Sequence, residues 1–141
     1  MSSNIKIVHE LAASLDSDDY VAAEQLLEPD AIYHTGDSTI LGRSEIIASF
    51  RATSEWGHRH LDALEFSHEI DDAKPSEIIF IDVLRKDGEE LRLEHAMHVG
   101  ISRRGLINEL RLQPRLGERE LVKQYFHRHG LTPVRSQERS E

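Results

Sequence analysis

The sequence predicts an α+β domain in which three to four helices cover one face of a curved antiparallel sheet. The N-terminal part alternates segments of helical periodicity with one short pair of strands, and long strands of alternating polarity follow. Helices segregated to one face of an antiparallel sheet are typical of this class. We therefore expect one sheet built mainly from the second half of the chain.

The stretch 78–112 organises the predicted sheet as three strands joined by two turns. Asp87-Gly88 is typical of a two-residue hairpin turn, because both positions accept a positive φ. This turn pairs Lys86 with Glu89. The same register predicts four further pairs: Leu84 with Leu91, Asp82 with Leu93, Phe80 with His95, and Ile78 with Met97.

The second turn lies at residues 103–105, and pairing Ser102 with Gly105 is the simplest register around it. That register predicts three pairs: Ile101 with Leu106, Val99 with Asn108, and Met97 with Leu110. A bulged alternative, with Ser102 opposite Leu106, would place Glu109 beside Val99. Because a slip of one residue turns whole rows of side chains to the other face, we prefer the unbulged register.

One face of these three strands is then apolar. Its members are Ile78, Phe80, Leu84, Leu91, Leu93, Met97, Val99, Ile101, Leu106, Leu110 and Leu112. Only three polar side chains interrupt it, namely Asp82, His95 and Asn108. These three are the first candidates for a functional site.

The remaining elements follow from periodicity and from helix-terminating residues. Helices are expected at 4–15, in a short segment between Ser17 and Pro29, and at 118–129 before Gly130. A further helix begins at Ser44 and ends at Gly57. Further strands are expected at 31–35, 39–41 and 58–70.

Composition limits the classes of partner. The chain has 141 residues, with 17 Lys and Arg against 26 Asp and Glu, and a formal net charge of −9. Nucleic acids and anionic membranes bind basic surfaces, so neither is expected as a partner. Without cysteine, neither disulfides nor thiolate chemistry is available. We expect a single domain over 1–131, with 132–141 as a disordered tail.

The N-terminal sequence MSSNIKIVHE has no apolar signal core, and no apolar run approaches the length of a membrane span. The expected location is therefore the cytoplasm. The outer sheet face would carry Ile79, Ile81, Val83, Arg92, Glu94, Ala96, His98, Ile107, Glu109 and Arg111. This mixture is too apolar for bare solvent and too charged for a core, so we expect a homodimer through the sheet.

Two stretches resemble a known family. PDAIYHTGDSTILGRSEIIASF is similar to a segment of SnoaL-like proteins in which a short strand ends in histidine and leads through Gly-Arg into a helix. ISRRGLINELRLQP resembles their strand, glycine turn and final strand. The resemblance implies membership of the nuclear transport factor 2 (NTF2)-like superfamily, with a cone-shaped α+β fold that encloses a pocket and commonly dimerises. Its members include ketosteroid isomerases, polyketide cyclases, dehydratases, epoxide hydrolases and binding modules without catalysis, so fold alone does not assign a function.

The sequence departs from the best-known chemistry of that superfamily. Where ketosteroid isomerases have a tyrosine, an aspartate base and a second acid, the alignment places Leu11, Thr35 and Met97. Scytalone dehydratase uses tyrosine, aspartate, histidine and asparagine around its pocket. Tyr33, Asp82, His95 and Asn108 are similar in type, although the spacing does not match residue by residue.

Asp82 and His95 are the candidate catalytic residues. They are diagonal neighbours on adjacent strands, roughly 7–8 Å apart at the backbone. An apolar shell raises the pKa of a carboxyl group and a protonated histidine lowers it, so such a pair can serve as general acid and base. The alternative is a buried ion pair with a purely structural role.

Other residues are candidates for binding a small apolar molecule. They are Tyr33, His34, Trp56, His60, Phe80, Met97 and Asn108. Either Tyr33 or His34 should point inward, and periodicity leaves open which one. His58 and His60 share one face of a predicted strand, but no supporting ligand falls at a suitable spacing, so we expect neither a metal nor another cofactor.

Two functions remain open. The protein could be a cofactor-free isomerase, cyclase or dehydratase acting on a cyclic or polyketide-like apolar substrate. Alternatively, it could be a non-catalytic ligand-binding or dimerisation module. An open cavity that reaches both Asp82 and His95 would favour the enzyme, and a filled cone would favour the module.

Overall fold

The computed structural model describes residues 2–132, so the predicted tail lies, apart from Thr132, outside the described residues. This part of the chain forms four helices and six strands. In order they are α1 (Ser2–Asp16), α2 (Tyr20–Gln25), β1 (Leu27–His34), β2 (Thr39–Leu41), α3 (Arg43–His60), β3 (Ala63–Glu69), β4 (Glu77–Lys86), β5 (Glu89–Ile101), β6 (Ile107–Pro114) and α4 (Glu118–Arg128). The predicted α+β class is confirmed.

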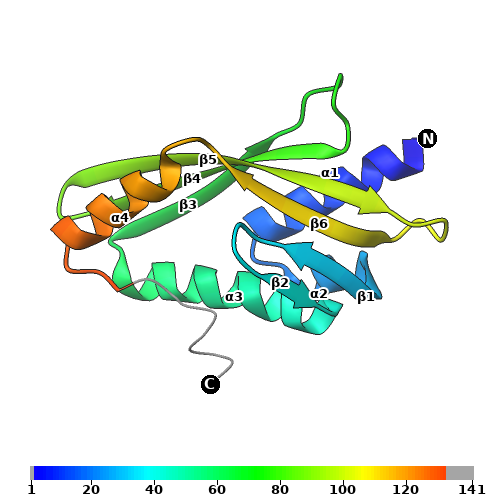
Figure 1. Ribbon diagram of the computed structural model, residues 1–141, viewed down its shortest axis with the longest axis horizontal. Coiled ribbons are helices and arrows are strands. Elements are labelled where there is room, and N and C mark those ends of the chain that lie inside the picture. Colours follow the sequence, from blue (N-terminus) through cyan, green and yellow to red (C-terminus); the bar gives the residue numbers. More distant parts are fainter. Residues whose placement is uncertain (1, 133–141) are drawn as a thin grey trace.

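The strands form one mixed sheet in the order β2-β1-β6-β5-β4-β3 (Figure 1). All neighbours are antiparallel except β1 and β6, which pair in parallel. The parallel pair places β1, from the N-terminal part of the chain, beside the last strand. The sheet does not close, and its curvature leaves a concave face.

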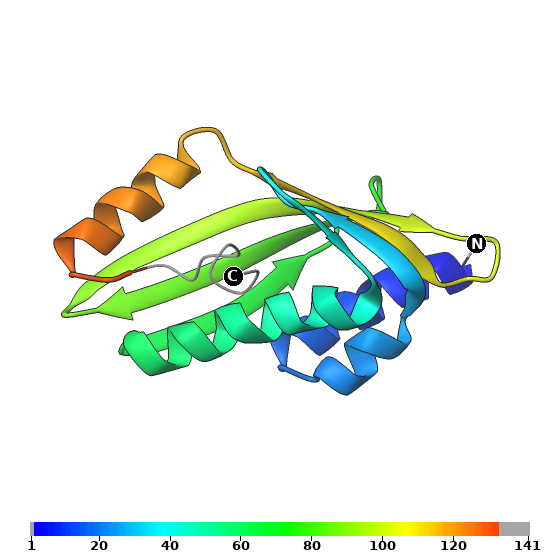
Figure 2. The same cartoon turned by 60° about the horizontal axis from the view of Figure 1, so that its bottom comes forward.

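The helices pack on the concave face (Figure 2). Buried residues of α1 and α3, among them Leu11 and Ile46, share one core with the inward residues Ile78, Met97 and Leu110. A second, smaller cluster joins Tyr125 of α4 to Leu61 and to Leu84 and Leu93 at the hairpin end of β4 and β5. Between the two clusters, the middle of the concave face is available for a ligand-binding site.

The predicted register of β4 and β5 is confirmed. Lys86 pairs with Glu89, Phe80 with His95, and Ile78 with Met97. The turn between them has positive φ at both central residues, 53° at Asp87 and 82° at Gly88. This conformation matches the right-handed twist of the strands it joins.

Gly88→Val is expected to destabilise the protein by about 1 kcal/mol or more, because a β-branched residue rarely adopts a positive φ. A Cβ at this position would meet no atom within 4 Å, so the loss would come from the backbone alone. Chemical denaturation would measure it. Gly88→Asn is the control. Asparagine tolerates a positive φ better than valine, so this variant should lose less stability.

The predicted register of β5 and β6 is wrong. Ile101 pairs with Ile107, one position from the prediction, because the turn is longer and the Ser102 N–H donates to the Leu106 carbonyl oxygen. A bulge between Gly100 and Ile101 adds a second position, so that Val99 pairs with Leu110 and Met97 with Leu112. Gly100 allows this irregularity: a Cβ there would lie 3.1 Å from Asn108 Oδ1. As a result Ile107, predicted on the outer face, is buried in the core, and Asn108 is exposed.

The predicted boundary between α3 and β3 is also wrong. The helix continues through Gly57 to His60, so His58 and His60 are helical and β3 begins only at Ala63. Gly57 does not end the helix. Instead it allows close packing, because a Cβ there would come 2.1 Å from Leu64 Cδ2.

Within residues 2–132 no helix combines the length and the apolar character that a membrane crossing requires. The convex sheet face is the one we expect to bury in a homodimer, and the dimer remains a prediction. Analytical ultracentrifugation should find a dimer at micromolar concentration. Ile79→Arg, on the half-buried part of this face, should shift the protein to monomer. A monomeric wild-type protein would contradict the expectation.

Candidate active site

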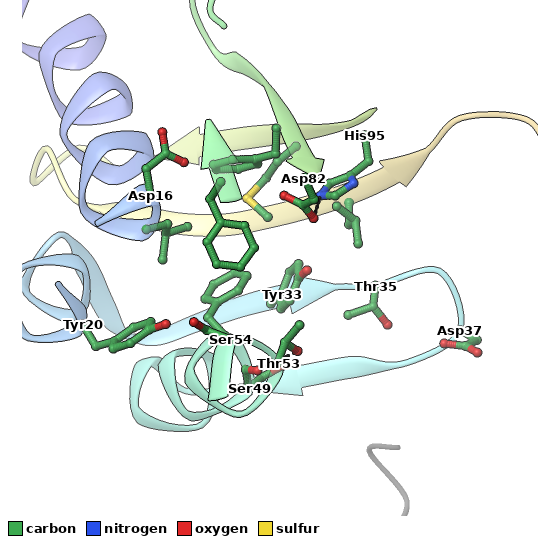
Figure 3. Close-up of a pocket in the computed structure, with 16 residues that line it drawn as sticks. Asp16, Tyr20, Tyr33, Thr35, Asp37, Ser49, Thr53, Ser54, Asp82 and His95 are labelled. Carbon is green, nitrogen blue, oxygen red and sulfur yellow. Dashed lines mark hydrogen bonds and ion pairs between the residues drawn. The ribbon is translucent and has the colours of Figure 1, made fainter. Parts of the chain in front are cut away.

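A cavity of about 390 Å³ lies between the concave sheet face and the helices (Figure 3). Its walls come from α1, α2, α3 and all strands except β2, with loop residues between them. The lining residues are Leu15, Asp16, Tyr20, Tyr33, Thr35, Asp37, Ser49, Phe50, Thr53, Ser54, Phe66, Phe80, Asp82, His95, Met97 and Leu112. Most of the cavity surface is apolar, although about half of its lining residues are polar or charged, and such a mixture suits a small-molecule site.

Asp82 and His95 both line this cavity, as the β4–β5 register requires. His95 Nε2 lies 3.7 Å from Asp82 Oδ2. Each side chain is about one-fifth exposed, at 20% for His95 and 21% for Asp82. The pair is therefore largely desolvated but reachable from the cavity.

Burial raises the pKa of Asp82 to about 6, well above its ordinary value. The neighbouring His95 opposes this effect, and the carboxylates of Glu118 and Asp16 add to it. A carboxyl group with this pKa exchanges its proton readily near neutral pH. Such tuning is what a general acid or base requires.

Glu118 holds the other side of His95. It lies at the start of α4, is 7% exposed, and places Oε1 3.7 Å from His95 Nδ1. Its Oε2 accepts a 2.8 Å hydrogen bond from the backbone N–H of Glu94, which fixes the carboxylate against β5. Burial raises the pKa of Glu118. The imidazole thus lies between one carboxylate in the cavity and one behind it.

The sequence prediction missed Glu118, because its approach to His95 depends on how α4 packs. It also missed the pair formed by Asp16 and His68. Asp16, the last residue of α1, lines the cavity and contacts His68 Nδ1 through Oδ2 at 2.5 Å. His68 lies opposite Phe80 in the sheet, and its alternation with Phe66 was the available signal for an inward direction.

Three predicted binding residues line the cavity: Tyr33, Phe80 and Met97. The choice between Tyr33 and His34 is settled in favour of Tyr33, which is 5% exposed and packs 5.1 Å from the Phe50 ring. His34 alternates to the other face, where Nε2 lies 2.9 Å from Glu109 Oε2. Burial raises the pKa of the Tyr33 hydroxyl far above its ordinary value, so it stays protonated as a hydrogen-bond donor.

The other predicted binding residues lie outside the cavity. Trp56 packs 5.1 Å from the Phe126 ring, and its Nε1 donates to the carbonyl oxygen of Thr132. His60 is exposed beside Trp56, because α3 continues past Gly57. Asn108 is exposed, because the bulge after Gly100 changes the direction of its side chain. Among the described residues, no three histidine or acidic side chains converge on a point that could hold a metal ion.

No protein-family model matches the sequence, and no curated protein sequence matches it. Solved structures match the fold. An NTF2-like protein of unknown function from Burkholderia pseudomallei is similar at 17% identity, with a TM-score of 0.62 over 84% of this chain and 95% of that one. A protein of Shewanella denitrificans assigned as a SnoaL-like polyketide cyclase shares 12% identity, with a TM-score of 0.62 over 86% and 97%.

TerC, co-crystallised with polyporic acid, is similar at 14% identity and a TM-score of 0.63, over 86% of this chain and 98% of that one. At these identities the likeness concerns the fold. The six-stranded curved sheet and the helices on its concave face agree with it. The chain therefore has the NTF2-like fold, as its resemblance to SnoaL-like proteins implied.

Proposed function

We propose that the protein is a cofactor-free acid–base enzyme, an isomerase, cyclase or dehydratase that acts on a cyclic or polyketide-like apolar molecule. Asp82 and His95 carry the proton transfer. The observation that supports this most strongly is the raised pKa of Asp82, about 6, in a cavity that also admits His95. The structural neighbour assigned as a polyketide cyclase agrees with this class of substrate.

The proposed step is proton abstraction next to a carbonyl group. The Asp82 carboxylate takes the proton from carbon, and the C–H electron pair passes to the carbonyl oxygen as an enolate forms. His95 donates a hydrogen bond to that oxygen, with Glu118 holding the far side of the imidazole. Return of the proton to the same carbon gives exchange with solvent, and its return elsewhere gives isomerisation. Loss of a β-hydroxyl group, which leaves as water with the proton that Asp82 took, would give dehydration.

Deuterium exchange tests this step without knowledge of the natural substrate. The probe is 2-tetralone, an apolar bicyclic ketone with acidic α-protons, whose exchange in D₂O can be followed by NMR. The protein should accelerate exchange above the buffer rate. The rate should rise through a pH of about 6 as Asp82 ionises. His60→Gln, outside the cavity, should leave the rate unchanged.

The alternative function is a binding module without catalysis. It would bind 2-tetralone or related ring compounds in the same cavity without accelerating exchange. If one protein sample binds 2-tetralone but does not accelerate its exchange, the enzyme proposal is wrong and the protein is a binding module. The open cavity at Asp82 and His95 favours the enzyme over the filled cone expected of a dimerisation module.

A further inference from the structure

The walls of the cavity carry carboxylates but no lysine or arginine. Asp16, Asp37 and Asp82 line it, and His95 is the sole basic side chain among the lining residues. Two arginines contact lining residues without lining the cavity themselves. Arg119 lies 3.8 Å from Asp37, and Arg51 lies 5.1 Å from the centre of the Tyr20 ring. A carboxylate or phosphate ligand would therefore be buried beside like charges with no guanidinium or ammonium partner.

Asp16 lacks a hydrogen-bond donor that a buried carboxylate normally has. His68 satisfies Oδ2 at 2.5 Å. Oδ1 is buried and has no hydrogen-bond partner in the part of the chain that the structure describes. Buried carboxylate oxygens nearly always accept a hydrogen bond, so within the described chain the Asp16 carboxylate is stabilised by the His68 contact alone. The Asp16 side chain is 20% exposed and lines the cavity, so a ligand can reach the carboxylate group.

Aromatic rings make up much of the remaining wall. Tyr20, Tyr33, Phe50, Phe66 and Phe80 all line the cavity. The faces of such rings attract cations as well as apolar groups, and the attraction strengthens when water is excluded. Carboxylates and aromatic faces in one cavity favour a positively charged organic molecule over a neutral or anionic one.

We propose that the ligand of this cavity is an organic amine, bound as its ammonium cation, with the nitrogen donating to Asp16 and a ring body against the aromatic walls. This rests on the proposed function, because it names the class of molecule that the same cavity takes. Asp16 and Asp82 lie at separate places along the cavity (Figure 3). The substrate is then a ring compound with a basic nitrogen at the Asp16 end and its reacting carbon at the Asp82 end.

Three naphthalene derivatives of similar size test the proposal by calorimetry on the full chain at pH 7.5. They are naphthalen-2-ylmethylamine, naphthalen-2-ylmethanol and 2-naphthoate, which are cationic, neutral and anionic at this pH. The amine should bind at least tenfold more tightly than the alcohol, and the carboxylate more weakly than the alcohol. Equal or tighter binding of the carboxylate, or no amine binding at millimolar concentration, would overturn the proposal. This comparison uses the wild-type protein and needs no variant.

Two matched variants then locate the charge effect. Asp16→Asn should bring amine binding down to the level of the alcohol and leave alcohol binding unchanged. Asp72→Asn removes one charge from an exposed residue and should retain the tenfold preference. If Asp72→Asn lost as much amine affinity as Asp16→Asn, the preference for the amine would come from the net charge of −9 rather than from the cavity.

The outcome is independent of the exchange experiment. 2-Tetralone is neutral, so its exchange reports on Asp82 and His95 whether or not the cavity prefers cations. If the protein accelerates exchange but does not prefer the amine, the proposed ligand class is wrong and the enzyme proposal stands. If the protein prefers the amine but does not accelerate exchange, the proposed ligand class stands and the protein is a binding module.

Discussion

Asp82→Asn should reduce the protein's acceleration of 2-tetralone exchange by on the order of 100-fold or more, the usual contribution of a positioned general base. Asparagine has the shape of aspartate but accepts no proton at neutral pH. His95 remains in place, because Glu118 still holds its other side. Ligand binding should therefore persist while exchange is lost.

The control for this result is Asp72→Asn, which makes the same chemical change on an exposed loop. It should exchange 2-tetralone at the wild-type rate. Undiminished exchange by Asp82→Asn, with the variant shown to be folded, would mean that another group abstracts the proton.

The same substitution should stabilise the protein at neutral pH. A carboxyl group whose pKa is raised on folding binds its proton more tightly in the native state than in the unfolded state. Its contribution to stability therefore falls as the pH rises from about 3.8 to about 6 and stays low above that pH. Each unit of pKa difference corresponds to about 1.4 kcal/mol, so the full effect is on the order of 2–3 kcal/mol for this largely buried group.

Urea denaturation of wild-type protein and Asp82→Asn at several pH values would measure this effect. The stability advantage of the variant should be largest at pH 8 and should shrink as the pH falls to 4. Comparing the stability advantage at different pH values removes any effect of the amide that does not depend on pH. Asp72→Asn, the control, should show no dependence of its stability difference on pH. An advantage independent of pH would contradict the raised pKa.

Local sequence signals were enough for the centre of the sheet. The Asp87-Gly88 turn alone set the register of β4 and β5, and with it the approach of Asp82 to His95. The turn is reliable because only a few residues accept its positive φ values, so the dipeptide and the conformation imply each other.

Glycines with a packing role misled the prediction. The sequence predicts that a helix ends at Gly57, but this residue lies within α3, where its missing side chain makes room for Leu64. Gly100 gave no warning of the bulge that exposes Asn108. In both cases the reason for the glycine is a contact with a residue from another element, which periodicity does not report.

The partners of the site histidines depend on tertiary packing as well. Asp16 and His68 come from α1 and β3, and Glu118 reaches His95 only because α4 lies against β5. Asp16 and Glu118 lie where their own helices predict an ordinary surface charge, and only His68 carried a signal of an inward direction, its alternation with Phe66. Pairs of this kind appear once the helices are placed on the sheet.

The proposed chemistry requires Asp82 to be a carboxyl group of raised pKa beside His95 in an open cavity. NMR titration of its side-chain carboxyl carbon in the ¹³C-labelled protein, assigned by comparison with Asp82→Asn, measures that pKa directly. The structure predicts a midpoint at about 6. A midpoint at the ordinary aspartate value, near 3.8, would show a solvated carboxylate and would contradict a role for Asp82 as a general base near neutral pH.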